Sequence, residues 1–222
     1  MNALKGVTGA VFGALLISAS AEAAVAVFET RAAWEAAVSG PFTETATFPG
    51  IAVFADVNAL TLNGGTTLTF GSAVNKRTIG IGWASWSGGF TGDVFYSKGL
   101  TSITAGISAI DAFGLELEPN PQDVITMSLI LNDGSDVTQE ITQDVDGDGG
   151  AKFFGWVGAG IVSITMSAES DFAFGRFVGV TKRLLPRLID EQHMDAPVGA
   201  ELAAMAQRVG GEAFVRQQTA IL

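Results

Sequence analysis

Short runs in which apolar and polar residues alternate dominate the chain from residue 45 to residue 180. Such alternation over four to ten residues is typical of β-strands with one face buried. Ten runs have strand length, at 67–72, 77–83, 93–97, 100–104, 109–118, 124–131, 137–142, 152–158, 161–167 and 172–180. The motifs "NGG" (63–65) and "NDGS" (132–135) predict hairpin turns, because Asn, Asp and Gly tolerate positive φ. The pattern predicts a mainly β body of β-sandwich or jelly-roll type.

Helical spacing of apolar residues occurs at the two ends of this body. The segment "FETRAAWEAAV" (28–38) predicts one short helix, capped by Thr30, with Trp34 and Val38 on one face. Residues 181–222 have little strand pattern, and Leu202, Met205, Ala206 and Val209 follow an i, i+3, i+4, i+7 spacing. The sequence therefore predicts a β-domain over 24–180 and a helical tail over 181–222.

The first 23 residues have the three parts of a secretory signal peptide. Lys5 lies in a short polar start, an apolar stretch follows at 6–21, and "AEA" (21–23) offers a small-x-small cleavage site. The apolar stretch is short for a permanent membrane span. We expect a mature chain that begins near Ala24, with no membrane span after cleavage, in the periplasm, at the cell surface or in the medium.

Charge and composition exclude several classes of function. The formal net charge is −11, and the tail contributes none of it, with five basic and five acidic residues. Nucleic-acid binding requires clustered Lys and Arg, so a nucleic-acid partner is not expected. The chain has no cysteine, which excludes disulfides and zinc–thiolate sites.

The stretch "DVDGDGG" (144–150) is a candidate calcium loop. Asp144, Asp146 and Asp148 match the first half of an EF-hand loop, with Gly149 at its sixth position. Position 12 is Gly155, however, and both flanks predict strands rather than helices. Two readings remain, a weak extracellular calcium site and an acidic hairpin turn open to water, and the second is favoured.

The stretch "GWASWSGGFTGDVFY" (82–96) is the candidate ligand-binding segment. Trp83, Trp86 and Tyr96 lie among glycine and serine residues and could stack on sugar rings. Burial of these rings in the core is the favoured reading, with Trp86 as the expected exception. No metal or organic cofactor other than calcium is indicated.

Two kinds of catalytic arrangement are relevant to this sequence, a pair of carboxylates and a serine-hydrolase motif. Glu116 and Glu118 in "LELE" fall on one face of a strand about 7 Å apart, a separation that suits glycoside hydrolysis. The favoured reading is a solvated face opposite buried Leu115 and Leu117. No G-x-S-x-G motif occurs, and the single histidine, His193, is in the tail, so the sequence does not predict a serine hydrolase.

Residues 1–180 resemble secreted PEP-CTERM-type proteins of bacteria that possess exosortases. The resemblance lies in the signal followed by "FETRAAWEAAV", then "AIDAFGLELEP", "VITMSLILNDGSDVTQEIT", "KFFGWVGAGIVSITMSA" and "DFAFGRFVGV". It implies a β-sandwich of matrix or cell-surface type, with no assigned activity. Gly175 and Arg176 replace the usual Asp-Asn of the last strand, which weakens the polar role implied there.

The tail departs from that group. It contains no Pro-Glu-Pro motif, apolar helix and basic cluster, and "GAELAAMAQRVGGEAFVRQQTAIL" resembles part of the cap region of α/β-hydrolases. The hypothesis is a fused or frameshifted gene end. From the sequence, the leading function is a secreted, non-enzymatic surface or matrix β-sandwich that binds carbohydrate or calcium, with an extracellular polysaccharide or cell-surface component as partner. The alternative is a hydrolase.

Overall fold

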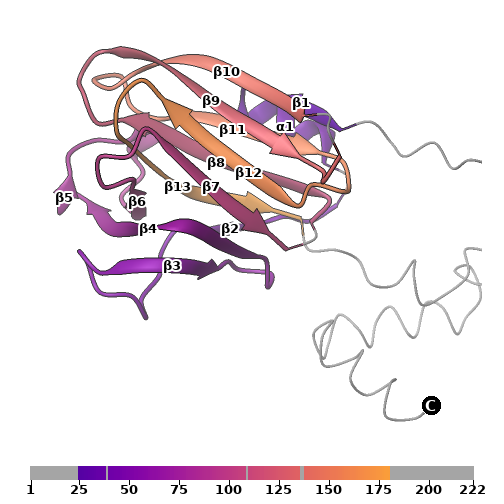
Figure 1. Ribbon diagram of the computed structural model, residues 1–222, viewed down its shortest axis with the longest axis horizontal. Helices are drawn as coiled ribbons and strands as arrows, with labels where there is room; N and C mark the ends of the chain where they lie inside the picture. The colour runs from indigo at the N-terminus through magenta and orange to yellow at the C-terminus, as the bar shows by residue number, and fades with distance from the viewer. Residues whose placement is uncertain (1–24, 39, 109, 136–137, 181–222) are drawn as a thin grey trace, which may run out of the picture.

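The computed structural model describes residues 25–38, 40–108, 110–135 and 138–180. The predicted signal peptide 1–23, the predicted helical tail 181–222 and His193 lie outside the described residues. The described part contains one α-helix, α1 (Arg31–Ala37), one short 3₁₀ helix, η1 (Ser87–Gly89), and strands throughout the remainder (Figure 1). The prediction of a mainly β body with a short helix before it is confirmed.

The strands account for all ten predicted runs. They are β1 (Ala26–Phe28), β2 (Thr43–Thr45), β3 (Asp56–Thr61), β4 (Thr67–Ile79), β5 (Gly82–Trp83), β6 (Asp93–Tyr96), β7 (Ser102–Ile107), β8 (Ala112–Pro119), β9 (Val124–Asn132), β10 (Thr138–Asp146), β11 (Lys152–Val157), β12 (Ser163–Ala168) and β13 (Phe172–Gly179).

Two details differ from the predicted runs. The run 77–83 is not one strand, because the chain turns at Gly80, where φ is +82°, and resumes as β5. Strands β1, β2 and β3 were not predicted. The first two have three residues each, too short for an alternating pattern to show. Both predicted hairpin turns are confirmed, between β3 and β4 and between β9 and β10.

The helix α1 forms as its sequence suggests. The hydroxyl of Thr30 accepts a hydrogen bond from the backbone N–H of Ala33 at 3.3 Å, which caps the N-terminus. Trp34 is fully buried and its indole N–H donates to the carbonyl of Trp156 at 2.9 Å. The helix begins at Arg31 rather than near 28, because Ala26–Phe28 pairs with β11 as β1.

The strands form one hydrogen-bonded sheet with the order β1-β11-β8-β13-β6-β4-β7-β12-β9-β10, and β2, β3 and β5 pair at its sides. Pairing is antiparallel except between β4 and β5. The sheet folds back on itself, so that β10 contacts β8 and β11 across the interior (Figure 1). This arrangement is consistent with the predicted β-sandwich.

The main core fills the space between the two halves of this folded sheet. From β8 it contains Phe113, Leu115 and Leu117, and from β10 it contains Ile141 and Val145. These residues occupy alternate positions along each strand, as the pattern predicted. No helix within the described part of the chain is long and apolar enough to cross a bilayer.

Strand β8 differs from a half-exposed strand because all eight of its residues are buried. One part of its outer face packs against α1, where Ala112 lies beside Trp34 and Phe153. Phe153 lies so close over Gly114 that a Cβ there would be 2.2 Å from its ring. The segment around β5 and η1 covers the other part, which contains Glu116 and Glu118. This second cover creates the candidate site.

Candidate functional site: a cleft beside two buried carboxylates

Glu116 and Glu118 project from the outer face of β8, but they are not solvated. Glu116 is 4% exposed and Glu118 is 2% exposed, so the prediction of a solvated face is wrong. Leu115 and Leu117 are fully buried on the opposite side, as expected. The reason for the error is that a segment 29 to 35 residues earlier in the chain folds over this face, which strand periodicity does not reveal.

The covering segment supplies a hydrogen-bond donor pair to each carboxylate. Trp83 Nε1 and Ser85 Oγ donate to Glu118 Oε1 at 3.0 and 3.1 Å. Trp86 Nε1 and Ser87 Oγ donate to Glu116 Oε2 at 2.6 and 3.4 Å. The motif "WASWS" thus contains two Trp and Ser donor pairs, Trp83 with Ser85 and Trp86 with Ser87, one pair for each glutamate of the strand beneath it.

Arg176 completes the surroundings of Glu116. It lies at an irregularity in the pairing of β13 with β8, with φ of +48°, and its guanidinium contacts Glu116 Oε1 at 3.1 Å and Glu44 Oε1 at 3.2 Å. It also lies over the ring of Phe90 at 5.6 Å. The resemblance implied a weakened polar role at this position, yet Arg176 is the cation that compensates a buried carboxylate.

The electrostatics of the two carboxyls differ. Burial raises the pKa of both, because a charged carboxylate loses its hydration. For Glu116, Arg176 and the Trp86 N–H oppose the rise in pKa. Glu118 has no cation partner among the residues that the structure describes, and its pKa rises to about 7. The Ala151 backbone N–H favours its charged form, but no hydrogen bond reaches its second oxygen, Oε2.

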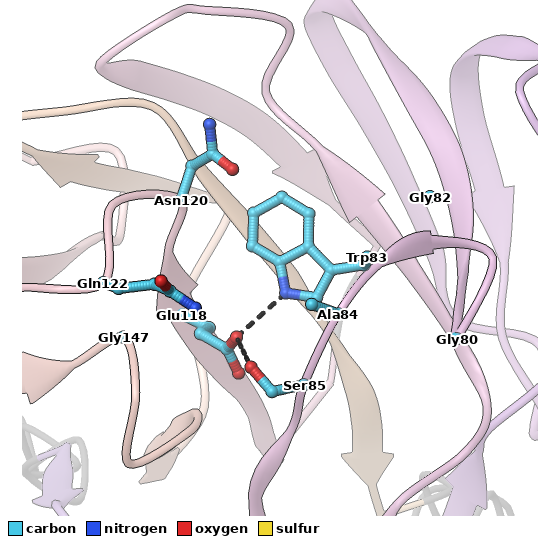
Figure 2. Close-up of a pocket in the computed structure, with 9 residues that line it drawn as sticks. All are labelled: Gly80, Gly82, Trp83, Ala84, Ser85, Glu118, Asn120, Gln122 and Gly147. Atoms are coloured by element: carbon cyan, nitrogen blue, oxygen red, sulfur yellow. Dashed lines mark hydrogen bonds between the residues drawn. The ribbon is translucent and has the colours of Figure 1, made fainter.

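A cleft of about 550 Å³ opens beside Glu118 (Figure 2). One wall comes from β5 and the residues on either side of it. The other wall comes from the end of β8 and from the β8–β9 and β10–β11 turns. In Figure 2 the indole N–H of Trp83 is directed at Glu118, and the side chains of Asn120 and Gln122 lie across from it. The lining residues are Gly80, Gly82, Trp83, Ala84, Ser85, Glu118, Asn120, Gln122 and Gly147.

A second hollow of about 220 Å³ continues this cleft, since the two share Gly82, Trp83 and Asn120. It adds Tyr96 and Arg77 to the lining. The Tyr96 hydroxyl donates to Asp171 Oδ2 at 2.5 Å, and this hydrogen bond and burial raise the pKa of Tyr96. Asn120 Nδ2 donates to the same oxygen at 3.1 Å. Tyr96 and Asn120 are therefore held in place by a shared acceptor, Asp171.

The structure brings together two of the three aromatic residues predicted to bind a ligand. The rings of Trp83 and Tyr96 lie 5.9 Å apart, and both line the second hollow. Trp86 does not line either hollow, and it packs against Phe90 at 6.2 Å. Trp83 and Trp86 are each 8% exposed, so the favoured prediction of burial is confirmed for both tryptophans. The expectation that Trp86 would be the exposed ring is therefore wrong, because its N–H is drawn down to Glu116.

The three aspartates of "DVDGDGG" remain at the surface. Asp144, Asp146 and Asp148 are exposed; Asp144 accepts from Thr126 at 2.7 Å, and Asp146 accepts from the backbone N–H of Asp148 at 3.0 Å. Over the described ranges, no group of three or more His, Asp or Glu side chains is placed to hold a metal ion. Another acidic residue, Asp133, lies at the opposite end of the β9–β10 hairpin from these three aspartates.

The cleft also contains residues that sequence reasoning did not single out, namely Arg77, Asn120 and Gln122. Asn120 and Gln122 lie in "EPNPQD", whose two prolines are typical of a turn and indicate no ligand. A weak signal was available for Glu118. It is one of two glutamates in an otherwise apolar strand, and a carboxylate buried in such a strand needs hydrogen-bond donors, which Trp and Ser side chains can supply. No spacing rule connects the two segments, however.

No protein-family model and no curated protein matches the chain. Among solved structures, one that is similar is TmCBM61 in complex with β-1,4-galactotriose. The sequences are 12% identical, the likeness covers 51% of this chain and 86% of that one, and the TM-score is 0.33.

Proposed function

We propose that residues 24–180 form a non-catalytic domain of a secreted surface or matrix protein, and that the domain binds carbohydrate in the cleft beside Trp83. The observation behind this proposal is the composition of the cleft. Trp83 and Tyr96 supply aromatic surface, while Ser85, Asn120 and Gln122 supply hydrogen-bonding groups around it. Sugars present apolar C–H faces and hydroxyl edges, so this combination suits them.

The geometry does not favour the hydrolase alternative. Glycoside hydrolysis by two carboxylates requires that both face the same glycosidic bond. Glu118 lines the cleft, whereas Glu116 is covered by Trp86 and Ser87 and is paired with Arg176. A single carboxyl with a raised pKa at the wall of the cleft suits hydrogen bonding to a ligand better than bond cleavage.

Affinity electrophoresis and calorimetry of the purified protein against a panel of neutral and acidic polysaccharides test this proposal. We expect at least one polysaccharide to bind, and Trp83→Ala to weaken that binding at least tenfold, because the aromatic face is lost. Val162→Ala is the matched control, since Val162 is 52% exposed at the Asn132 end of β9, away from the cleft. A panel without binding, or turnover that Glu118→Gln abolishes, would overturn the proposal.

Secretion is part of the proposal and rests on residues 1–23. N-terminal sequencing of protein recovered from the periplasm or the medium should give a chain that begins within a few residues of Ala24. Recovery of intact Met1 in the cytoplasm would contradict export.

A further inference from the structure

Arg77 is a cation in the cleft that has no acidic partner. It lies near the end of β4 and lines the second hollow with Trp83, Tyr96 and Asn120. Within the described ranges it forms no ion pair, and its buried Nε atom has no hydrogen-bond acceptor. A guanidinium has five N–H donors, so this side chain retains unused capacity at the wall of the cleft.

Two aromatic rings hold the guanidinium in place. The guanidinium carbon of Arg77 is 4.7 Å from the centre of the Phe54 ring and 5.4 Å from that of Tyr96. Such stacking uses the flat face of the guanidinium and leaves its edge available for hydrogen bonds. The arrangement thus orients the side chain without consuming its donors.

The backbone at Phe54 is fixed in a strained conformation. Phe54 is 53% exposed and has φ of +68°, which is rare for an aromatic residue. Its N–H donates to the carbonyl of Lys76 at 2.8 Å, and its carbonyl accepts from Asn75 Nδ2 at 2.7 Å. The space for its ring depends on Gly82, where a Cβ would be 2.6 Å from that ring. Strain maintained by surrounding bonds is a feature of functional sites.

The nearby acidic groups have partners of their own. Asp56 pairs with Lys98 at 2.5 Å and accepts from Asn75 at 2.7 Å, and Asp171 accepts from Tyr96 and Asn120. Arg77 contributes only weakly to the lowered pKa of Asp56, as the last of its causes. The positive charge of Arg77 therefore has no direct counter-charge in this part of the molecule.

We infer that the ligand of the cleft is an acidic saccharide whose carboxylate binds Arg77, while a sugar ring lies against Trp83. A carboxylate matches the planar edge of a guanidinium through two parallel hydrogen bonds. This inference rests on the proposed function and specifies its ligand class. One arginine suits one carboxylate, in contrast to the Lys and Arg clusters that bind phosphate backbones.

The test compares ligands that differ only in charge. Oligogalacturonides, alginate oligomers and glucuronoxylan oligomers are titrated against the protein beside the same oligomers with their carboxyls reduced to alcohols. A salt concentration near 0.15 M screens the repulsion that the net charge of −11 exerts beyond about 8 Å. For at least one pair we expect the carboxylated oligomer to bind about tenfold more tightly than its reduced form.

Variants of Arg77 assign this preference to the side chain. Arg77→Met should remove the preference for the carboxylated oligomer and should change affinity for the reduced oligomer less than twofold. Arg77→Lys should retain only part of this preference, because an ammonium lacks the two parallel N–H donors of a guanidinium. Circular dichroism checks that both variants are folded. Trp83→Ala should weaken binding of both oligomers.

The outcomes separate this inference from the proposed function. Equal binding of carboxylated and reduced oligomers, both weakened by Trp83→Ala, would overturn the acidic ligand and leave carbohydrate binding intact. A preference that Arg77→Met does not alter would also overturn it. Binding of neither form, or of sulfated oligomers only, would overturn it as well, and absence of binding to every glycan would overturn the proposed function too.

Discussion

Two groups of carboxylates have opposite surroundings. One consists of Glu116 and Glu118 on β8, and the other consists of Asp144, Asp146 and Asp148 at the end of β10. The glutamates lie beneath two tryptophans and accept hydrogen bonds from them, whereas the aspartates face the solvent. By sequence alone, the three aspartates within five positions are a stronger candidate for a functional site than the two glutamates within three positions. The comparison teaches that cover by another segment, not density of charge along the chain, makes a carboxyl chemically unusual.

The largest expected effect comes from removing the cover of Glu116. Trp86→Ala should destabilise the domain by about 3–5 kcal/mol, because a large buried ring is lost and a buried carboxylate loses a donor. Trp86→Phe should cost less, since most of the packing is retained. Urea denaturation at pH 7 measures both. Equal stability of Trp86→Ala and the parent would show that the cover is dispensable and would remove the contrast between the two acidic stretches.

The next effect is the pH dependence of stability caused by Glu118. Its pKa is about 7 in the folded protein and about 4.5 in the unfolded chain, so the folded state binds more protons between these values. The free energy of unfolding should therefore fall as pH rises from about 5 to about 8, by up to about 3 kcal/mol for this group.

Glu118→Gln tests that assignment, since it cannot ionise. Thermal melts from pH 5 to pH 9 should show a flatter profile for this variant than for the parent, and a higher melting temperature at pH 8. Asp146→Asn, at an exposed carboxylate, is the matched control and should leave the slope in place. A parent profile that rises with pH over this range would contradict the expected sign.

A smaller effect is expected for the cation that compensates Glu116. Arg176→Met should cost about 2 kcal/mol, because it leaves a buried carboxylate without its ion pair, although Arg176 is itself 25% exposed. Lys98→Met is a close control, since Lys98 also has positive φ and pairs with an acidic residue, Asp56, at the surface. Its effect in denaturant melts should be much smaller. Equal effects of the two substitutions would indicate that burial of Glu116 is unimportant.

The smallest effect is expected at the exposed aspartates. Millimolar calcium and a chelator should give the same melting temperature, because the carboxylates of Asp144, Asp146 and Asp148 are solvated and do not converge on a shared position. A rise of several degrees in calcium, abolished by Asp146→Ala, would establish a metal site and reverse the comparison.

Most of the fold could be predicted from the sequence, because strand periodicity and turn residues are local properties. The ten runs, the two hairpins and the cap of α1 were identified in this way. The site could be predicted only in part. Trp83 and Tyr96 were singled out as aromatic residues among glycines, but their neighbours Glu118 and Asn120 come from a distant segment, and Arg77 lies on the preceding strand β4. Whether Glu118 is buried depends on which loop covers β8, and that is decided by tertiary packing.

The position of β13 in the sheet has a consequence for biogenesis. The last strand in the described chain is inserted between β8 and β6 and also pairs with β2. A growing polypeptide therefore cannot complete its sheet until residues near 179 have left the ribosome. Long-range closure of this kind is slow relative to local folding. The sheet therefore stays incomplete for as long as the chain is being synthesised.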